Sequence, residues 1–178
     1  MSRIAIPALD AATGATAEVY AGIKKAVGAV PNTYAALGAL VPEALKTFLA
    51  VDGLLAGGTL GKKDVETIRL VVSQGTGCDY CLAAHTMLGK MAGLPVETLR
   101  ALRSGQPTGD AKRDALADFV RLLVDTTGTL RQAQFDAIKA AGYTDVQLAE
   151  ISMAVAGIIF TNVFNRINDT DIDFPAVV

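Results

Sequence analysis

The spacing of apolar residues constrains the fold of this chain more than any other feature. Apolar residues recur three or four positions apart through most of the sequence, as in the stripe of Val65, Ile68 and Val72. No segment alternates apolar and polar residues as a half-buried strand does. The pattern therefore predicts an all-α fold.

Glycine, proline and capping residues predict where the helices begin and end. Pro42 suits the first turn of a helix, and Gly75-Thr76-Gly77 predicts a three-residue turn between two helices. Thr129 with Gln132, and Thr144 with Gln147, fit the capping box. We expect helices from Pro42 to Gly57, over 62–74, over 78–93, from Pro95 to about Ser104, and over 111–126, 130–141 and 145–165.

Length and charge exclude several classes of protein. The 178 residues contain no internal repeat or long linker, so 1–178 is expected to be a single domain. A net charge of -2 argues against a nucleic-acid partner. The longest uninterrupted apolar run, Ala154 to Phe160, is far shorter than the ~20 residues that cross a bilayer. The N-terminus lacks the apolar core of a signal peptide, so we expect a cytoplasmic protein without a membrane partner.

The chain is more apolar than a small monomer needs. It is 51% hydrophobic before its 17 glycines are counted, and its mean hydropathy is +0.38. This excess predicts burial between subunits, hence a homo-oligomer. The helices at about 33–57 and 145–165 are the expected interfaces, since small and apolar residues dominate them.

Both cysteines and the only histidine lie together in the motif Cys78-x-x-Cys81-x-x-x-His85. A helix advances about 100° per residue, so the three side chains fall within an arc of roughly 60°. In a cytoplasmic protein a close cysteine pair is more often catalytic or metal-binding than structural. The motif therefore predicts a redox dithiol with a base beside it.

A carboxylate is expected opposite that base. Counted outward from Thr76, Glu66 lies ten residues back and His85 nine residues forward. A short turn favours antiparallel neighbours, so the two residues reach the same level of a helical hairpin. Glu66 would then fix the tautomer of His85, in direct contact or through a water.

This arrangement suits peroxide reduction. The start of a helix stabilises a thiolate, and His85 lies one turn from Cys81 and can take its proton. The Cys81 thiolate would attack the O–O bond of a hydroperoxide and become a sulfenic acid, which Cys78 would condense with to form a disulfide. A dithiol of lipoyl or thioredoxin type would then reduce that disulfide.

Other interpretations use the same residues. The cysteines could be core fillers, or a thiol redox sensor or disulfide reductase that consumes no peroxide. A zinc site would have Cys78, Cys81 and His85 on one helix face, whereas tetrahedral zinc needs ligands around it; we expect no metal. Tyr80 could line a pocket or pack in the core. A polar cluster near the end of the last helix could line an interface or face solvent: Asn162, Asn165, Arg166 and Asn168.

Glu66 followed by the motif resembles the AhpD-like alkylhydroperoxidase branch of the carboxymuconolactone decarboxylase family, in particular its peroxidase-related group. The resemblance extends over roughly residues 30 to 175 and includes Val30-Pro31-Asn32, the segment Leu60 to Gly77, Ala84-His85-Thr86, and the tail from Asn165-Arg166-Ile167-Asn168-Asp169-Thr170 to Asp173-Phe174-Pro175.

The resemblance implies an all-helical fold, trimers or hexamers, and cofactor-free reduction of hydroperoxides. It implies that Cys81 is the peroxidatic cysteine, that Cys78 is its resolving partner, and that Glu66 and His85 form a proton relay. Decarboxylase members lack the cysteine pair, which disfavours a lyase activity. Some members have a histidine between the cysteines, where this chain has Tyr80, so that histidine's contribution does not transfer.

Overall fold

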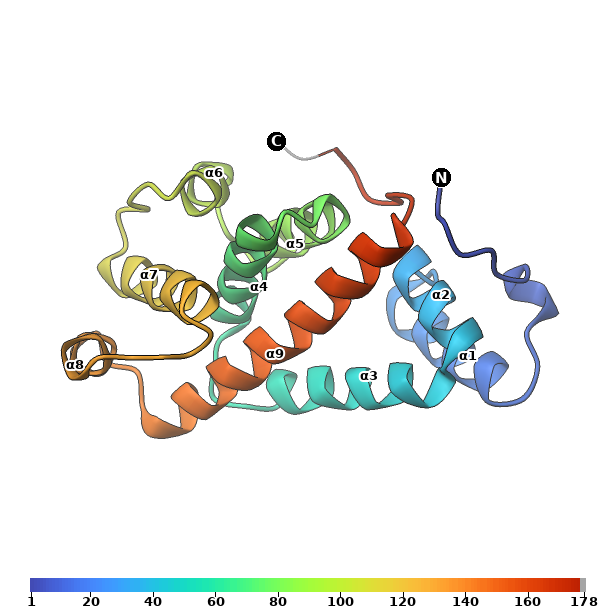
Figure 1. The fold of residues 1–178 in the computed structure, drawn as a ribbon, viewed down its shortest axis with the longest axis horizontal. Helices are drawn as coiled ribbons and strands as arrows, with labels where there is room; N and C mark the ends of the chain where they lie inside the picture. The colour runs from blue at the N-terminus through green and yellow to red at the C-terminus, as the bar shows by residue number, and fades with distance from the viewer. Residues whose placement is uncertain (177–178) are drawn as a thin grey trace.

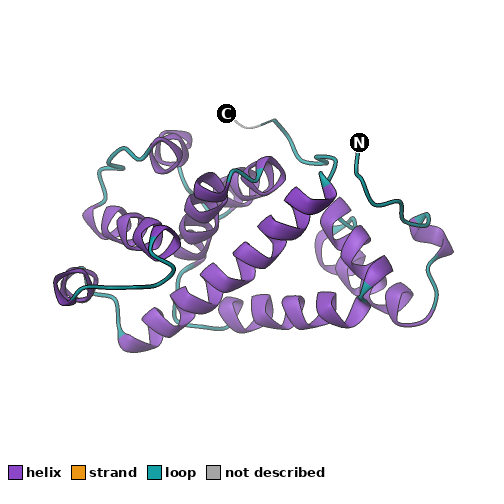
Figure 2. Cartoon of the chain, in the orientation of Figure 1, coloured by secondary structure: helices purple, strands orange, loops and turns teal. Residues whose placement is uncertain are grey.

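The computed structural model describes residues 1–176, and within this range all regular secondary structure is helical (Figure 2). The predicted all-α class is confirmed. The elements are a short 3₁₀ helix η1 (Leu9–Ala11), α1 (Gly14–Val27), α2 (Asn32–Leu40), α3 (Pro42–Ala56), α4 (Lys62–Thr76), α5 (Asp79–Met91), α6 (Val96–Ser104), α7 (Ala111–Asp125), α8 (Gln132–Ala140) and α9 (Asp145–Asn168).

Two helices organise the molecule. α4 is the central element and packs against α5, α7 and α9. α9 runs diagonally across the view in Figure 1, with α3 below it and α2 near its C-terminal end. α6, α7 and α8 lie at the left of the view, with α6 against α4 and α5, and α7 against α4 and α8. The side chains of α4 that hold these layers together, such as Ile68, Leu70 and Val72, are fully buried because they face helices on several sides.

The α4–α5 hairpin turns more sharply than the sequence predicts. Gly75 and Thr76 remain helical, and Thr76 Oγ1 donates to the carbonyl of Val72 inside the helix. The chain reverses at Gly77, which adopts a left-handed φ of +66°, and the Cys78 N–H closes the turn on the carbonyl of Ser73 at 3.1 Å. The expected three-residue turn is therefore wrong, but the antiparallel hairpin carrying the cysteine motif is confirmed.

One of the two expected capping boxes forms. Thr144 caps α9: its hydroxyl accepts the Gln147 N–H, and Gln147 Oε1 accepts the Thr144 N–H. The box expected at Thr129 is wrong, because α8 begins at Gln132, and its N-cap is Arg131.

Within the described residues, α9 is long and apolar enough to cross a membrane by length and composition, with a mean hydropathy of 1.5 over its best 18-residue window. Core helices of soluble proteins pass the same test. α9 packs against α3, α4 and α5, and its buried side includes Asn162, Asn165 and Asn168 together with apolar residues. α9 is therefore packed on one side, and 33% of its apolar window is buried.

Candidate active site

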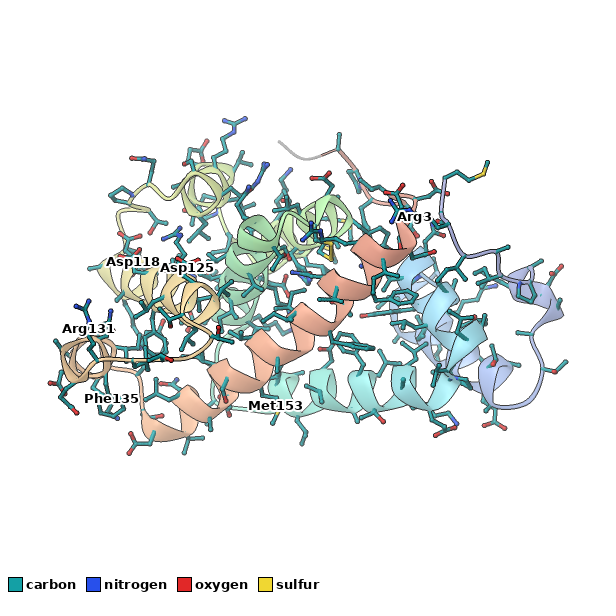
Figure 3. The ribbon with its side chains drawn as sticks, in the orientation of Figure 1. Arg3, Asp118, Asp125, Arg131, Phe135 and Met153 are labelled. Carbon is teal, nitrogen blue, oxygen red and sulfur yellow. A yellow bond between two sulfur atoms is a disulfide. The ribbon has the colours of Figure 1, made fainter. Side chains whose placement is uncertain are left out.

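The two cysteines lie where α5 begins. Cys78 is the N-cap of α5, and Cys81 follows in the first turn, so their Cα atoms are 5.3 Å apart and the sulfurs form a disulfide (Figure 3). The Cys81 N–H donates to Cys78 Sγ at 3.4 Å. Both side chains are buried, with 1% and 3% of their surface exposed. The expected position of the pair at a helix N-terminus is confirmed.

Glu66 and His85 meet across the hairpin. Glu66 Oε2 lies 2.8 Å from His85 Nδ1, so the expected contact exists and is direct. Because the carboxylate accepts the Nδ1 proton, the neutral imidazole has its lone pair on Nε2. His85 therefore has one nitrogen held by Glu66 and the other available for proton transfer.

Arg69 and Asp52 extend this pair into a charged chain. Arg69 Nη1 lies 3.4 Å from Glu66 Oε1, and Arg69 Nη2 lies 2.5 Å from Asp52 Oδ1. Both residues were missed from the sequence. The spacing of three between Glu66 and Arg69 on one helix is a signal that could have found the arginine, whereas Asp52 comes from α3 and is placed by tertiary packing.

The two carboxyl groups respond differently to burial. Burial by itself raises the pKa of Glu66, but the charge and hydrogen bond of His85, together with Arg69, outweigh it and hold the pKa below its usual range. For Asp52 burial outweighs the attraction of Arg69, and the pKa is raised. The surroundings of Glu66 therefore favour its ionised form.

Buried asparagines on α9 complete the surroundings of the cysteines. Asn165 Nδ2 donates to Cys81 Sγ at 3.3 Å, and its Oδ1 accepts the Thr33 hydroxyl at 2.7 Å. Asn162 does not contact the sulfur in this way: its Nδ2 donates to Thr76 Oγ1. The expectation that this polar cluster lines an interface or faces solvent is wrong for all three asparagines, which are at least 96% buried. Arg166 is exposed and donates to the Thr76 carbonyl.

Tyr80 satisfies both interpretations of its role. Only 6% of it is exposed, yet it borders a cavity. Its hydroxyl accepts the Thr33 N–H at 3.2 Å, and its ring stands edge-on to Phe174, with the centroids 5.4 Å apart. Tyr80 thereby joins the site helix to α2 and to the C-terminal tail.

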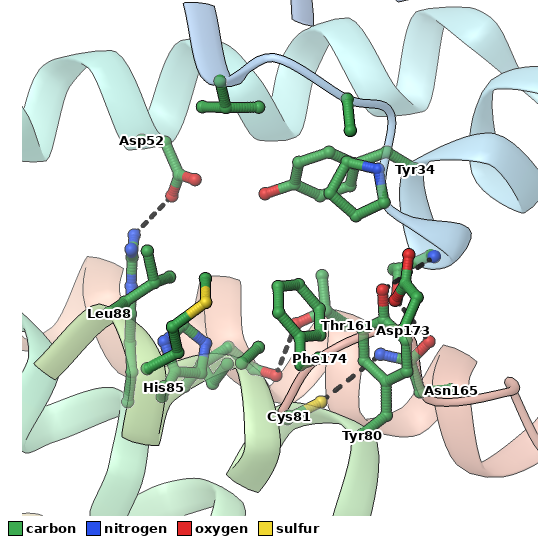
Figure 4. Close-up of a pocket in the computed structure, with 18 of the residues that line it drawn as sticks. Tyr34, Asp52, Tyr80, Cys81, His85, Leu88, Thr161, Asn165, Asp173 and Phe174 are labelled. Atoms are coloured by element: carbon green, nitrogen blue, oxygen red, sulfur yellow. Dashed lines mark hydrogen bonds and ion pairs between the residues drawn. The ribbon is translucent and has the colours of Figure 1, made fainter. Parts of the chain in front are cut away.

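A cavity of about 450 Å³ opens beside Cys81 and His85 (Figure 4). Its wall is mainly apolar and aromatic, with rings from Tyr34, Phe48, Tyr80 and Phe174. Polar groups on the wall come from Asp52, Arg69, Thr33, Asn165 and Asp173. Among the residues that the structure describes, Cys81 borders this cavity and Cys78 does not. Cys81 is therefore the sulfur that a molecule in the cavity would meet.

A second cavity, of about 330 Å³, reaches the other end of the charged chain. Glu66 borders it and His85 does not, while Asp52, Arg69 and Leu88 border both cavities. The Glu66–His85 contact thus joins two residues that border different cavities.

Within residues 1–176, no group of three or more His, Cys, Asp or Glu side chains is placed so that it could hold a metal ion. The two cysteines that a zinc site would use are bonded to each other.

A family model covers the helices that carry Glu66 and the cysteine motif. Residues 42–118 match the carboxymuconolactone decarboxylase family. The chain is therefore similar to this family over α3 to α6 and the first half of α7. The matched span contains Glu66, the turn at Gly77 and the whole cysteine motif. A search of curated proteins found no match.

Solved structures are similar in fold over nearly the whole chain. A structure described as an alkylhydroperoxidase AhpD core, an uncharacterized peroxidase-related protein from Ralstonia eutropha JMP134, has a TM-score of 0.84 at 21% identity and covers 97% of this chain and 92% of its own. An uncharacterized peroxidase-related protein from Silicibacter sp. TM1040 gives 0.82 at 23%, over 96% and 91%. The debrominase Bmp8, a cysteine-to-alanine variant in complex with 2,3,4-tribromopyrrole, gives 0.80 at 17%, over 97% and 94%. At these identities the likeness establishes an AhpD-like fold.

Proposed function

We propose that this chain is a cofactor-free thiol peroxidase that reduces organic hydroperoxides through Cys81 and Cys78. One observation supports this above all: Cys81 borders an apolar cavity next to His85, whose Nδ1 is held by Glu66 at 2.8 Å. A nucleophile and a base thus border the same cavity, and a carboxylate orients the base. The AhpD-like fold and the peroxidase-related names of the similar structures agree with it.

The reaction balances with a dithiol as the reductant. His85 Nε2 takes the proton of the Cys81 thiol, and the thiolate attacks the terminal oxygen of ROOH. The O–O bond breaks, Cys81 becomes a sulfenic acid, and the departing alkoxide takes a proton from His85 to leave as ROH. The Cys78 thiolate then attacks the sulfenic sulfur, water leaves, and the disulfide forms. An external dithiol of lipoyl or thioredoxin type returns both cysteines to thiols.

The proposal extends to the setting of the protein. A dithiol that must be reduced in each cycle needs a reducing compartment, so we place the protein in the cytoplasm. We treat residues 1–178 as one AhpD-like domain without metal or nucleic-acid partner.

Steady-state turnover tests the activity. Consumption of cumene hydroperoxide with dihydrolipoamide should continue over many turnovers, withstand a chelator, and be lost in Cys81→Ser. A thiol sensor predicts one turnover followed by the disulfide. A disulfide reductase predicts oxidation of dihydrolipoamide by a small disulfide without peroxide. Equal rates for wild type and Cys81→Ser would falsify catalysis at this site.

Reductive dehalogenation of an aromatic compound is a second candidate. The observation in its favour is the aromatic-lined cavity of about 450 Å³, which is larger than a peroxide group needs, in a fold shared with a debrominase. The same dithiol would supply two electrons: an aryl bromide and two thiols give the arene, HBr and a disulfide. Bromide release from 2,3,4-tribromopyrrole, measured against peroxide consumption under the same conditions, separates the two activities.

We also propose that the chain forms a homo-oligomer, with a trimer or hexamer as the expected form. Apolar residues follow a heptad spacing along the exposed side of α9, and such a seam is a contact surface for another helix. They are Val146, Ala149, Met153, Ala156, Phe160, Val163 and Ile167. This set, the α9 stripe, lies in one of the two regions that the sequence favours as interfaces.

A further inference from the structure

The amide of Asn165 is aimed at the sulfur that borders the cavity. Its Nδ2 lies 3.3 Å from Cys81 Sγ, and the side chain is 96% buried. The dashed line in Figure 4 joins these two groups, one from α5 and one from α9. Asn165 also borders the large cavity, so its amide lies where a substrate would react.

A second contact determines which end of the amide faces the sulfur. The Thr33 hydroxyl donates to Asn165 Oδ1 at 2.7 Å, so the carbonyl end is engaged and the NH₂ end is directed to Cys81. Thr33 is itself buried, and its backbone N–H donates to the Tyr80 hydroxyl at 3.2 Å. α2 therefore holds Asn165 in the orientation that suits a negatively charged sulfur.

The sulfur needs such a donor once it loses its proton. At 3% exposure a thiolate has little contact with water, and burial disfavours the charge. The helix N-terminus gives less help than its position suggests, because the Cys81 N–H donates to Cys78 Sγ. Among the described residues, Asn165 is the side chain recorded as donating to Cys81 Sγ.

The strength of the contact depends on the state of the sulfur. Hydrogen bonds to an ionised acceptor are roughly twice as strong as those between neutral groups. A disulfide or thiol sulfur is a weak acceptor, whereas a thiolate is a strong one. The Asn165 contact is thus stronger in the reactive state than in the resting one, which is the condition for a group that aids catalysis.

We propose that Asn165 is a catalytic residue of this site, whose Nδ2–H stabilises the Cys81 thiolate, and that Thr33 is the positioning residue that orients it. The catalytic role of Asn165 rests on the proposed function. Thiolate stabilisation itself is measurable without turnover.

Charged and titratable groups border the cavity beside Cys81 from several elements. They are Tyr80 and His85 on α5, Arg69 on α4, Asp52 on α3, Tyr34 on α2 and Asp173 in the tail. Glu66 contacts His85 and Arg69 and does not border this cavity. Replacing the neutral Asn165 leaves all of these charges in place, so a change in the behaviour of the thiol reports the lost hydrogen bond.

The experiment uses reduced protein in which Cys78→Ser leaves Cys81 as the single cysteine. Thiolate absorbance near 240 nm and the rate of iodoacetamide alkylation are followed against pH. Adding Asn165→Leu should move the midpoint upward by about one pH unit and slow alkylation about tenfold below the midpoint. Thr33→Val should shift the midpoint in the same direction by a smaller amount.

Asn162→Leu is the matched control. It removes a buried amide from the same helix, one turn earlier, whose hydrogen bonds go to Thr76 and Ser73. It should leave the midpoint unchanged. If Asn165→Leu fails to fold, the shift of the midpoint is measured in the near-isosteric Thr33→Val instead.

An unchanged midpoint in a folded Asn165→Leu, or an equal shift in Asn162→Leu, would overturn the proposal. Failure of the proposed peroxidase is a separate result: wild type would then show no peroxide turnover, while the dependence of the midpoint on Asn165 would still stand.

Discussion

His85 and Glu66 face each other across the α4–α5 hairpin, with Nδ1 2.8 Å from Oε2, and they border different cavities. The imidazole is on the side of Cys81, and the carboxylate is on the side away from it. In the proposed reaction, the proton that His85 takes from Cys81 therefore stays on the side of the large cavity, where the departing alkoxide takes it. Arg69 and Asp52 keep the carboxylate in place without touching the sulfur.

This relay predicts strongly non-additive kinetics. Glu66→Gln and His85→Ala should each slow oxidation of Cys81 near neutral pH, by up to about 10²–10⁴-fold for loss of a general base. The double variant should be little slower than His85→Ala, because the two residues act as a unit. Stopped-flow measurement of sulfenic acid formation in the Cys78→Ser background gives the rates.

Asp64→Asn is the control for the relay. Asp64 is also an acidic residue of α4, but it pairs with Arg113 at 3.5 Å. It does not border either cavity described above, so its loss should leave the rate unchanged. Small and additive losses in the two relay variants would instead make Glu66 a structural charge.

Glu66 also predicts how stability depends on pH. Its pKa in the folded protein is below the usual 4.5, so the ionised form is the one that folding favours. Its contribution is present above about pH 4.5 and is lost as the pH falls through the lowered pKa. Between pH 7 and pH 3, the free energy of unfolding should fall further in wild type than in Glu66→Gln.

Asp52 should change the pH dependence of stability in the opposite direction, and it serves as the internal comparison. Its pKa is raised, so ionisation costs stability as the pH rises through the raised value. Urea unfolding of wild type, Glu66→Gln and Asp52→Asn at several pH values measures all three slopes. Identical slopes for Glu66→Gln and wild type would contradict the charge assignment.

The sequence was sufficient to find the residues that lie within one hairpin. Glu66, Cys78, Cys81 and His85 are joined by a local turn, so helical spacing alone brings them together even though the turn was placed one or two residues too early. Asn165 is 84 positions from Cys81, and no spacing rule joins α5 to α9.

The asparagines of α9 show why polarity was misleading. Asn162, Asn165 and Asn168 repeat every three residues on the buried side, while Val163 and Ile167 are exposed. A polar stripe normally faces solvent, but here it is buried because each amide finds a partner inside. At the C-terminal end of α9, next to the site, polar side chains are therefore buried and apolar ones are exposed.

Gly77 is predicted to be essential to the hairpin for a backbone reason. A Cβ at this position would meet no atom within 4 Å, but φ is +66°, a conformation that L side chains rarely adopt. Gly77→Ala should therefore cost about 1–2 kcal/mol of unfolding free energy. Gly61→Ala is the control, since Gly61 has equal space and a φ of −67°. Equal losses in denaturant unfolding would show that the left-handed conformation is not the cause.

The last prediction concerns the α9 stripe. Val163 is 51% exposed on this stripe, and placing a charge there should separate subunits that pack through it. Phe135→Asp on α8 is the control: Phe135 is an exposed apolar side chain outside the stripe, and Figure 3 labels it apart from Met153 of the stripe. Light scattering should give wild type and Phe135→Asp a mass several times the 18.5 kDa of one chain. Val163→Asp should approach the mass of one chain. A wild-type mass near 18.5 kDa at micromolar concentration would rule out the oligomer, and an unchanged mass for Val163→Asp would move the interface away from α9.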